Sequence, residues 1–328
     1  FLAEVGDQNQ AELAGILAAS GLPRTVGGHD DLAATISHRS ASTAPAERVV
    51  PKGLRSFDRQ DADFFLALLP GPRDRDGLPE SIRFWKERAE SVNPADTFRV
   101  GVIYGPSGCG KSSLAKAGLL PRLDDARVVS AYVEATAVDT ETRLLRRLRN
   151  DFPQLPQHDS LRETLAALRR KPALSGGKKV LLVLDQFEQW LHGRSEGERS
   201  ELIAALRQCD GKRVSCLLLV RDDFWLALSR FMSELEADMV AGRNVALVDL
   251  FDLRHAKRVL AAFGRAYEAL PADPQQTTDE QQRFLDQAVA SLAEDGKVVC
   301  VRLTLLAEMM KGKPWQPSVL RELGGAEG

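Results

Sequence analysis

The sequence predicts an α/β fold in which a parallel sheet is flanked by helices and followed by a C-terminal helical subdomain. Three observations support this prediction. Short apolar runs alternate with amphipathic helical windows between residues 98 and 250, as is typical of parallel strands covered on both faces. A glycine-rich turn joins the first apolar run to the helical window that follows it. After Leu253 the strand patterns mostly stop, and the remaining windows have helical periodicity.

Each element follows from its local pattern. Near-continuous apolar runs predict five strands, at Phe98–Tyr104, Val128–Glu134, Lys179–Asp185, Val214–Val220 and Val245–Leu250. Helical periodicity predicts the intervening helices, at Ser112–Leu120, Glu141–Asn150, Leu161–Lys171, Glu198–Gln208 and Phe224–Glu236. Two short helices are expected before the sheet and three after it, at Asp61–Leu69, Leu78–Ala89, Arg254–Leu270, Asp279–Glu294 and Cys300–Met310.

The chain is predicted to have three parts. Residues 1–52 are expected to be a partial helix and a flexible linker, because residues 20–53 are rich in Ser, Thr, Ala, Gly and Pro. Residues 53–253 would form the α/β domain. Residues 254–328 would form a truncated helical subdomain. The chain begins with Phe1 instead of Met, so we expect it to be a piece of a longer protein.

Composition narrows the function classes. Of the 328 residues, 44% are hydrophobic and 27% are charged, and the net charge is −2; such values are typical of globular proteins and favour neither a nucleic-acid nor a membrane partner. The basic stretch TRLLRRLR is interpreted as a solvated helix face with Leu144, Leu145 and Leu148 turned inward. The four cysteines form no CxxC pair, which argues against a zinc site or a disulfide framework and favours a reducing, cytoplasmic setting.

The glycine-rich turn carries the strongest functional signal. Residues 105–112 read GPSGCGKS and match G-x-x-x-x-G-K-[ST] at every fixed position. Glycines let backbone N–H groups turn toward phosphate oxygens, and the following helix presents its N-terminus to the same anion. Lys111 would reach the β- and γ-phosphates, and the Ser112 hydroxyl would ligate Mg²⁺. The expected nucleotide-contacting residues are Gly105, Pro106, Ser107, Gly108, Cys109, Gly110, Lys111, Ser112 and Ser113.

Cys109 is the one unusual residue of this loop. We interpret it as a small residue that the loop tolerates. The alternative is a redox-sensitive thiol.

An acidic site is predicted after the third apolar run. Mg²⁺ needs a carboxylate at the end of a neighbouring buried strand, and Asp185 directly follows Val180–Leu184. Glu188 lies three residues further on and would polarise the attacking water as a general base. The alternative interpretation is an Asp185 that only caps the next helix, with Glu188 on the solvated face of that helix.

The next predicted strand ends near Arg221. An arginine at this position would sense the γ-phosphate. An ion pair with Asp222 or Asp223 is the alternative, and the sequence does not favour either interpretation.

Four segments together resemble the bacterial STAND class of signal-transduction ATPases, in particular the novel STAND NTPase group of multidomain regulatory proteins. They are GLRSFDRQDADFF (53–65), IYGPSGCGKSSLAKAGLLPRL (103–123), VLLVLDQFEQWL (180–191) and LLLVRDDFW (217–225). The family usually carries a G-R-E motif near the base, and here the corresponding segment reads LLPGPRDRDGLPES.

The resemblance implies an ASCE-type P-loop ATPase that works as a switch. ADP would hold an off state, and ATP exchange with self-association would give an on state. By similarity, Lys111 and Ser112 bind phosphate and Mg²⁺, Asp185 has the metal role, Glu188 is catalytic and Arg221 is the sensor. Such proteins frequently carry an upstream Ser/Thr kinase domain and downstream WD40 repeats or a formylglycine-generating-type domain.

The predicted function is therefore an ATP-binding, slowly hydrolysing regulatory switch that uses ATP or ADP with Mg²⁺. ATP is favoured over GTP because the sequence has no Asn-Lys-x-Asp guanine signature. One alternative is a small-molecule kinase built on the same loop. Another is a non-catalytic scaffold that nucleotide stabilises, and an AAA-type DNA-remodelling motor is a weaker third.

Overall fold

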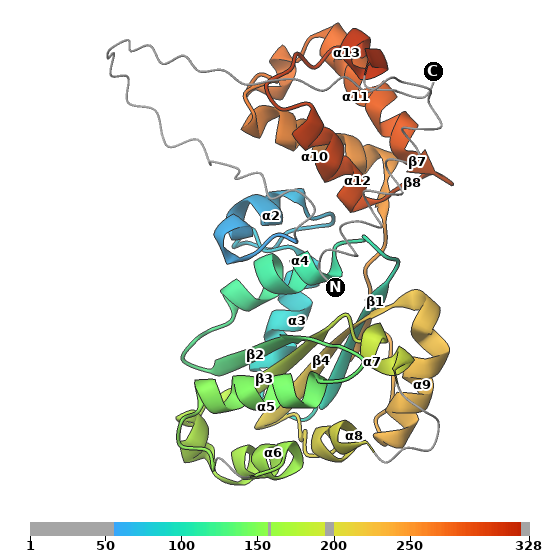
Figure 1. Ribbon diagram of the computed structural model, residues 1–328. Helices are drawn as coiled ribbons and strands as arrows, with labels where there is room; N and C mark the ends of the chain where they lie inside the picture. The colour runs from blue at the N-terminus through green and yellow to red at the C-terminus, as the bar shows by residue number, and fades with distance from the viewer. Residues whose placement is uncertain (1–55, 157–158, 194–199, 323–328) are drawn as a thin grey trace, which may run out of the picture. The chain divides into compact units, whose positions relative to one another are not determined.

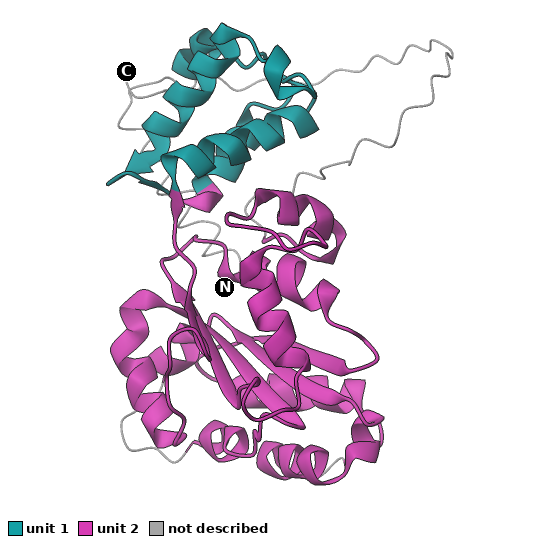
Figure 2. Ribbon diagram, turned by 180° about the vertical axis from the view of Figure 1, so that it is seen from behind, with its two compact units in different colours: residues 1–54, 252–298, 302–328 teal, residues 55–251, 299–301 magenta. Residues whose placement is uncertain are grey.

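The computed structural model describes residues 56–156, 159–193 and 200–322. The linker and partial helix predicted for residues 1–52 lie outside these described residues. The described residues divide into two compact units, coloured separately in Figure 2. One unit comprises residues 56–251 and 299–301, and the other comprises residues 252–298 and 302–322.

The first unit is built on a five-stranded sheet with the order β2-β3-β4-β1-β5 (Figure 1). Every ladder in it is parallel, which confirms the predicted fold class. β4 lies between β1 and β3, so the strand that ends in Asp185 is the second neighbour of the strand that enters the glycine-rich turn. The strands are β1 (Val100–Gly105), β2 (Val128–Glu134), β3 (Lys179–Asp185), β4 (Val214–Arg221) and β5 (Val245–Leu247).

Helices cover both faces of this sheet because successive strand residues point to opposite sides. In β3, Leu182 and Leu184 belong to one hydrophobic core, and Leu181 and Val183 belong to the other. The first core is completed by α5 (Thr140–Asp151), α6 (Leu161–Arg170), α8 (Glu201–Leu206) and α9 (Trp225–Glu234). The second core is completed by α2 (Ala62–Leu68), α3 (Glu80–Glu90) and the helix after the glycine-rich turn.

The helix after the turn is not uniform. It starts as α4 (Lys111–Ser113), continues as a π-helix over Leu114–Leu119 and ends in a 3₁₀ turn at Leu120–Arg122. The sequence predicted one regular helix here. π-helical turns are rare in proteins, and many of those that occur lie at functional sites.

The basic helix α5 is a solvated helix with an apolar inner face. Leu144 and Leu148 are fully buried in the first core, as predicted. On its outer side, Arg143 forms an ion pair with Asp139 at 2.8 Å. Arg147 likewise pairs with Asp151 at 2.7 Å. Two of the four arginines of α5 are therefore paired with carboxylates on or next to the same helix.

The second unit is largely helical. It contains the helices α10 (Leu253–Ala266), α11 (Asp279–Leu292), most of α12 (Cys300–Met309) and α13 (Pro317–Glu322). Two antiparallel strands of two residues each, β7 (Ala293–Glu294) and β8 (Lys297–Val298), form a hairpin between α11 and α12. Its core includes Phe284 and Trp315, whose ring centroids are 5.2 Å apart. In the described part of the chain, no helix combines the length and the apolar character needed to cross a membrane.

Candidate functional site

The glycine-rich loop connects the end of β1 to α4, and two of its glycines are required by the backbone. A Cβ atom at Gly105 would lie 1.9 Å from the carbonyl oxygen of Val248. Gly110 precedes α4 with a φ of +97°, a backbone conformation that residues with a side chain rarely adopt. The loop therefore has the close packing and the sharp turn that the sequence motif predicts.

Lys111 extends back over the loop. Its Nζ donates hydrogen bonds to the carbonyl oxygens of Gly105 at 2.7 Å and Pro106 at 2.8 Å. The ammonium is thus held beside the loop, where a phosphate would compete with these two carbonyls for it.

Cys109 is buried within the same loop, with its Sγ 3.7 Å from Lys111 Nζ. Burial raises the pKa of the Cys109 thiol, and the charge of Lys111 only partly opposes that effect. A protonated thiol is a poor nucleophile. This favours the interpretation of Cys109 as a small packing residue over a redox-sensitive one.

The two serines at the start of α4 have different surroundings. Ser112 is partly exposed. Ser113 is buried, and its Oγ accepts a hydrogen bond from the backbone N–H of Phe57 at 3.1 Å. The Ser113 hydroxyl, which the sequence analysis assigned to the nucleotide, is thus engaged with the segment before α2.

Asp185 ends β3 with only 1% of its surface exposed. Its Oδ1 accepts the backbone N–H of Gln186 at 2.8 Å, and its Oδ2 accepts the phenol of Tyr132. The following helix α7 (Glu188–His192) has Phe187 at its N-cap and no side-chain cap. Asp185 is therefore an oriented, buried carboxylate, and the capping alternative does not describe it.

Glu188 is the first residue of α7 and is 6% exposed, so it does not lie on a solvated face. Its Oε2 accepts the backbone N–H of Arg221 at 3.3 Å. Burial raises the pKa of the Glu188 carboxyl, against the opposing charge of Lys111. A carboxyl with a raised pKa is better matched to proton transfer near neutral pH than an ordinary glutamate.

Arg221 ends β4 and pairs in register with Gly105 of β1. Its guanidinium donates two hydrogen bonds to the carboxylate of Asp223, at 3.1 and 2.7 Å. This is the ion pair that the sequence left as an alternative. Both side chains are substantially exposed, and such pairs contribute only about 0–1 kcal/mol, so the guanidinium can exchange Asp223 for another anion.

The carboxyl ends of β1, β3 and β4 carry all of these predicted residues to one edge of the sheet. Gly105 lies opposite Arg221, and the backbone of Arg221 contacts Glu188. The charge of Lys111 acts on Glu188. This edge therefore brings together the Lys111 ammonium, two buried carboxylates and an arginine.

Sequence reasoning missed Tyr132 of β2, which donates to Asp185. Burial and the neighbouring Asp185 raise the pKa of the Tyr132 phenol well above its usual range. The sequence held a signal for it, because Tyr132 lies two residues before the end of the predicted strand Val128–Glu134. When this strand is the parallel neighbour of the Asp185 strand, as it is here, the two strand ends lie side by side and bring Tyr132 to Asp185.

Gln186 connects the strand of Asp185 to Glu188 in a strained conformation, with a φ of +53°. This region costs a residue with a side chain about 1–2 kcal/mol. We expect Gln186→Gly to leave the free energy of unfolding unchanged or to raise it by up to about 1 kcal/mol, because glycine's own entropy cost offsets part of the relief. The control Gln189→Gly, inside α7, should lower it by about 1 kcal/mol. Equal losses in urea denaturation would contradict this assignment of strain.

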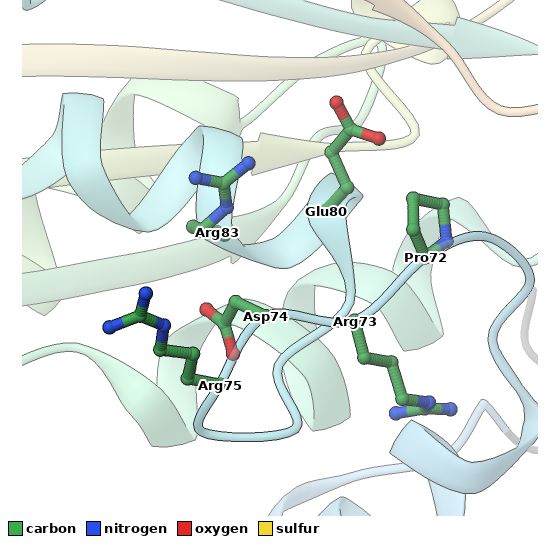
Figure 3. A pocket seen from close by; sticks show the side chains of 6 residues that line it. All are labelled: Pro72, Arg73, Asp74, Arg75, Glu80 and Arg83. Atoms are coloured by element: carbon green, nitrogen blue, oxygen red, sulfur yellow. The ribbon is translucent and has the colours of Figure 1, made fainter.

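The segment before α3, where the resemblance predicted a G-R-E motif, contributes to an open pocket of about 540 Å³ (Figure 3). The pocket is lined by Pro72, Arg73, Asp74, Arg75, Glu80 and Arg83. Asp74 Oδ1 accepts the backbone N–H groups of Asp76 at 3.0 Å and Leu78 at 2.8 Å. Arg73 donates to the carbonyl oxygen of Leu66. Asp74 and Arg73 therefore hold the segment itself in shape.

Solved structures share this architecture. The Walker-type ATPase paby2304 of Pyrococcus abyssi has 18% sequence identity and a TM-score of 0.50, over 74% of this chain and 71% of that protein. The Aeropyrum pernix ORC2 protein, solved as ADPNP-ADP complexes, has 20% sequence identity and a TM-score of 0.52, over 79% of this chain and 71% of that protein. Together with the strand order, these similarities show the fold of an ASCE-type P-loop NTPase. The comparison with curated proteins gave no match.

A family model gives the closer assignment. The model described as novel STAND NTPase 1 matches residues 52–259, more than half of the 328 residues. The matched range contains the glycine-rich loop, both buried carboxylates and Arg221. The resemblance inferred from the four sequence segments is confirmed: the chain belongs to the novel STAND NTPase 1 family.

Proposed function

We propose that this chain is the ATP-binding, slowly hydrolysing switch of a larger regulatory protein. The observation that supports this most is the arrangement at one edge of the sheet. The phosphate loop with Lys111, the oriented carboxylate of Asp185 and the buried carboxyl of Glu188 lie there together. These are the parts that nucleotide binding and attack by water require.

The donor set suits Mg²⁺. Among the described residues, no group of three or more His, Cys, Asp or Glu side chains could hold a metal ion. Mg²⁺ is commonly bound by one or two protein oxygens together with waters and substrate phosphates. Ser112 and Asp185 supply a hydroxyl and a carboxylate of this kind. The ion would neutralise charge on the phosphates when bound.

The chain's own residues perform the remaining steps of this proposal. Lys111 would leave the carbonyl oxygens of Gly105 and Pro106 for the phosphates. Glu188 would take a proton from the attacking water, and Arg221 would exchange Asp223 for the γ-phosphate. Slow turnover fits a switch because the bound nucleotide, and not the product, carries the signal.

In the proposed cycle, ADP holds the off state, and ATP favours an on state in which copies of the chain associate. A switch requires states with different affinity for ATP and ADP, and the helical unit is our candidate for the element that changes. We place the chain in a reducing, cytoplasmic setting, which the wide spacing of its four cysteines favours. Partners would act through flanking kinase, WD40 or formylglycine-generating-type domains, as in similar proteins.

The test is to identify the nucleotide released when freshly purified protein is denatured. We expect stoichiometric ADP that added ATP displaces slowly. Protein without nucleotide that turns over ATP rapidly would contradict the switch, and phosphate transfer to a metabolite instead of water would indicate a kinase. Tight binding with no hydrolysis and no nucleotide-dependent change in size would indicate a scaffold.

A further inference from the structure

Two hydrogen bonds fix the Asp185 carboxylate, and they come from different parts of the fold. The bond to Oδ1 comes from the adjacent backbone N–H of Gln186 at 2.8 Å. The bond to Oδ2 comes from the Tyr132 phenol, 53 residues earlier in the chain and on the neighbouring strand. One donor on each oxygen sets the rotation of the carboxylate as well as its position.

A second carboxylate lies on the same face of the sheet as this phenol. Glu134 ends β2, and in the parallel register it lies opposite Asp185. Tyr132 and Glu134 are two residues apart on one strand, so their side chains lie on the same face of the sheet. The charge of Glu134 also raises the pKa of the Tyr132 phenol. A phenol has only one proton to donate, so Tyr132 cannot serve both carboxylates equally.

Lys116 contacts both Glu134 and Tyr132. It lies in the π-helical continuation of α4, and its Nζ is 2.7 Å from Glu134 Oε1. The same ammonium lies 4.9 Å from the centroid of the Tyr132 ring. Lys116 therefore neutralises Glu134 and packs against the ring whose hydroxyl faces Asp185. It also bonds Ser56 Oγ at 3.3 Å, in the segment before α2.

We propose that Tyr132 is a positioning residue for nucleotide hydrolysis: its phenol holds Asp185 in the orientation that ligates the magnesium ion, and Lys116 keeps Glu134 from taking that hydrogen bond. The inference rests on the proposed function, because it assigns Asp185 to the metal. Tyr132 touches neither nucleotide nor water in this role. It acts through Asp185.

The first test is the Mg²⁺ concentration needed for half-maximal ATP hydrolysis. A hydrogen bond to a charged group contributes about 1.5–3 kcal/mol, and about 1.4 kcal/mol corresponds to a factor of ten. Tyr132→Phe should therefore raise this concentration at least about tenfold, the lower end of that range, with ATP affinity in EDTA unchanged. The control is Tyr104→Phe, on β1 of the same sheet. The Tyr104 ring packs on Trp225, with the two ring centroids 4.7 Å apart. Unchanged Mg²⁺ dependence in Tyr132→Phe would overturn the inference.

The second test uses Lys116, and it remains decisive if Tyr132→Phe does not fold. Lys116→Met should release Glu134 to compete for the phenol and shift the Mg²⁺ dependence in the same direction. Adding Glu134→Gln should restore it to near the wild-type value, because a neutral amide competes less well than a carboxylate. A purely structural role of Lys116 predicts no restoration, and that result would overturn the inference.

The wild-type protein separates the two levels of the proposal. Titrated with ATP at increasing Mg²⁺, it should show Mg²⁺-dependent binding and hydrolysis. If it shows neither, the proposed function fails and the inference fails with it. If the wild type behaves as expected while the Tyr132 and Lys116 variants match it, the inference alone fails.

Discussion

Replacing Lys111 with alanine is expected to lower the affinity for ATP by at least about 100-fold. Charge-assisted hydrogen bonds contribute about 1.5–3 kcal/mol each, and Lys111 is expected to contact two phosphates. The loss of two such contacts exceeds the roughly 2.8 kcal/mol that a 100-fold change requires. The measurement is a titration with labelled ATP.

The variant should remain folded. Lys111 Nζ now satisfies the carbonyl oxygens of Gly105 and Pro106, so its loss is expected to cost on the order of 1–3 kcal/mol of stability. Lys171→Ala is a suitable control, because Lys171 is exposed at the end of α6 and distant in sequence from the loop. Wild-type affinity in a folded Lys111→Ala protein would refute the phosphate-loop assignment.

Replacing Glu188 with glutamine should slow ATP hydrolysis by about 10²- to 10⁴-fold, which is the usual contribution of a general base. Nucleotide binding should change little, because the amide has nearly the same shape and can still accept the N–H of Arg221. Single-turnover hydrolysis with pre-bound ATP separates the two effects. Glu87→Gln, on an exposed position of α3, is the matched control.

The raised pKa of Glu188 also predicts the pH dependence. A base must be deprotonated, so wild-type hydrolysis should fall as pH decreases through a pKa above the usual glutamate value. This acid limb should disappear in Glu188→Gln. Retention of both the rate and the acid limb would remove Glu188 from the mechanism.

The free energy of unfolding should depend on pH in the direction opposite to the hydrolysis rate. Because the folded-state pKa is above the unfolded value, the folded protein binds this proton more tightly, and wild-type stability declines as pH rises through the raised pKa. Glu188→Gln should therefore be more stable than the wild type near neutral pH. The difference should vanish at a pH below the unfolded-state pKa, as thermal unfolding at the two pH values can establish.

The sequence alone determined the strands of the sheet and the position of the glycine-rich turn after the first of them. The limits of β2 and β3 were predicted to the residue. β3 is buried along its whole length and ends at Asp185, and β2, although it lies at an edge of the sheet, ends at the charged Glu134. The turn between β1 and α4 was equally readable, since its motif occupies eight consecutive residues. β5 is shorter than predicted, ending at Leu247: it is an edge strand with one partner, β1, so pairing ends before the apolar pattern does.

Only the tertiary structure decided how the site is assembled. The insertion of β4 between β1 and β3 depends on which strands pair, and no local window encodes that choice. The burial of Glu188, the pairing of Arg221 with Asp223 and the bond from Tyr132 to Asp185 depend on side chains brought close by strand register and helix packing. The sequence specified which groups were present. Long-range packing specified which of them meet, because hydrogen bonds and desolvation act over a few ångströms in space and not along the chain.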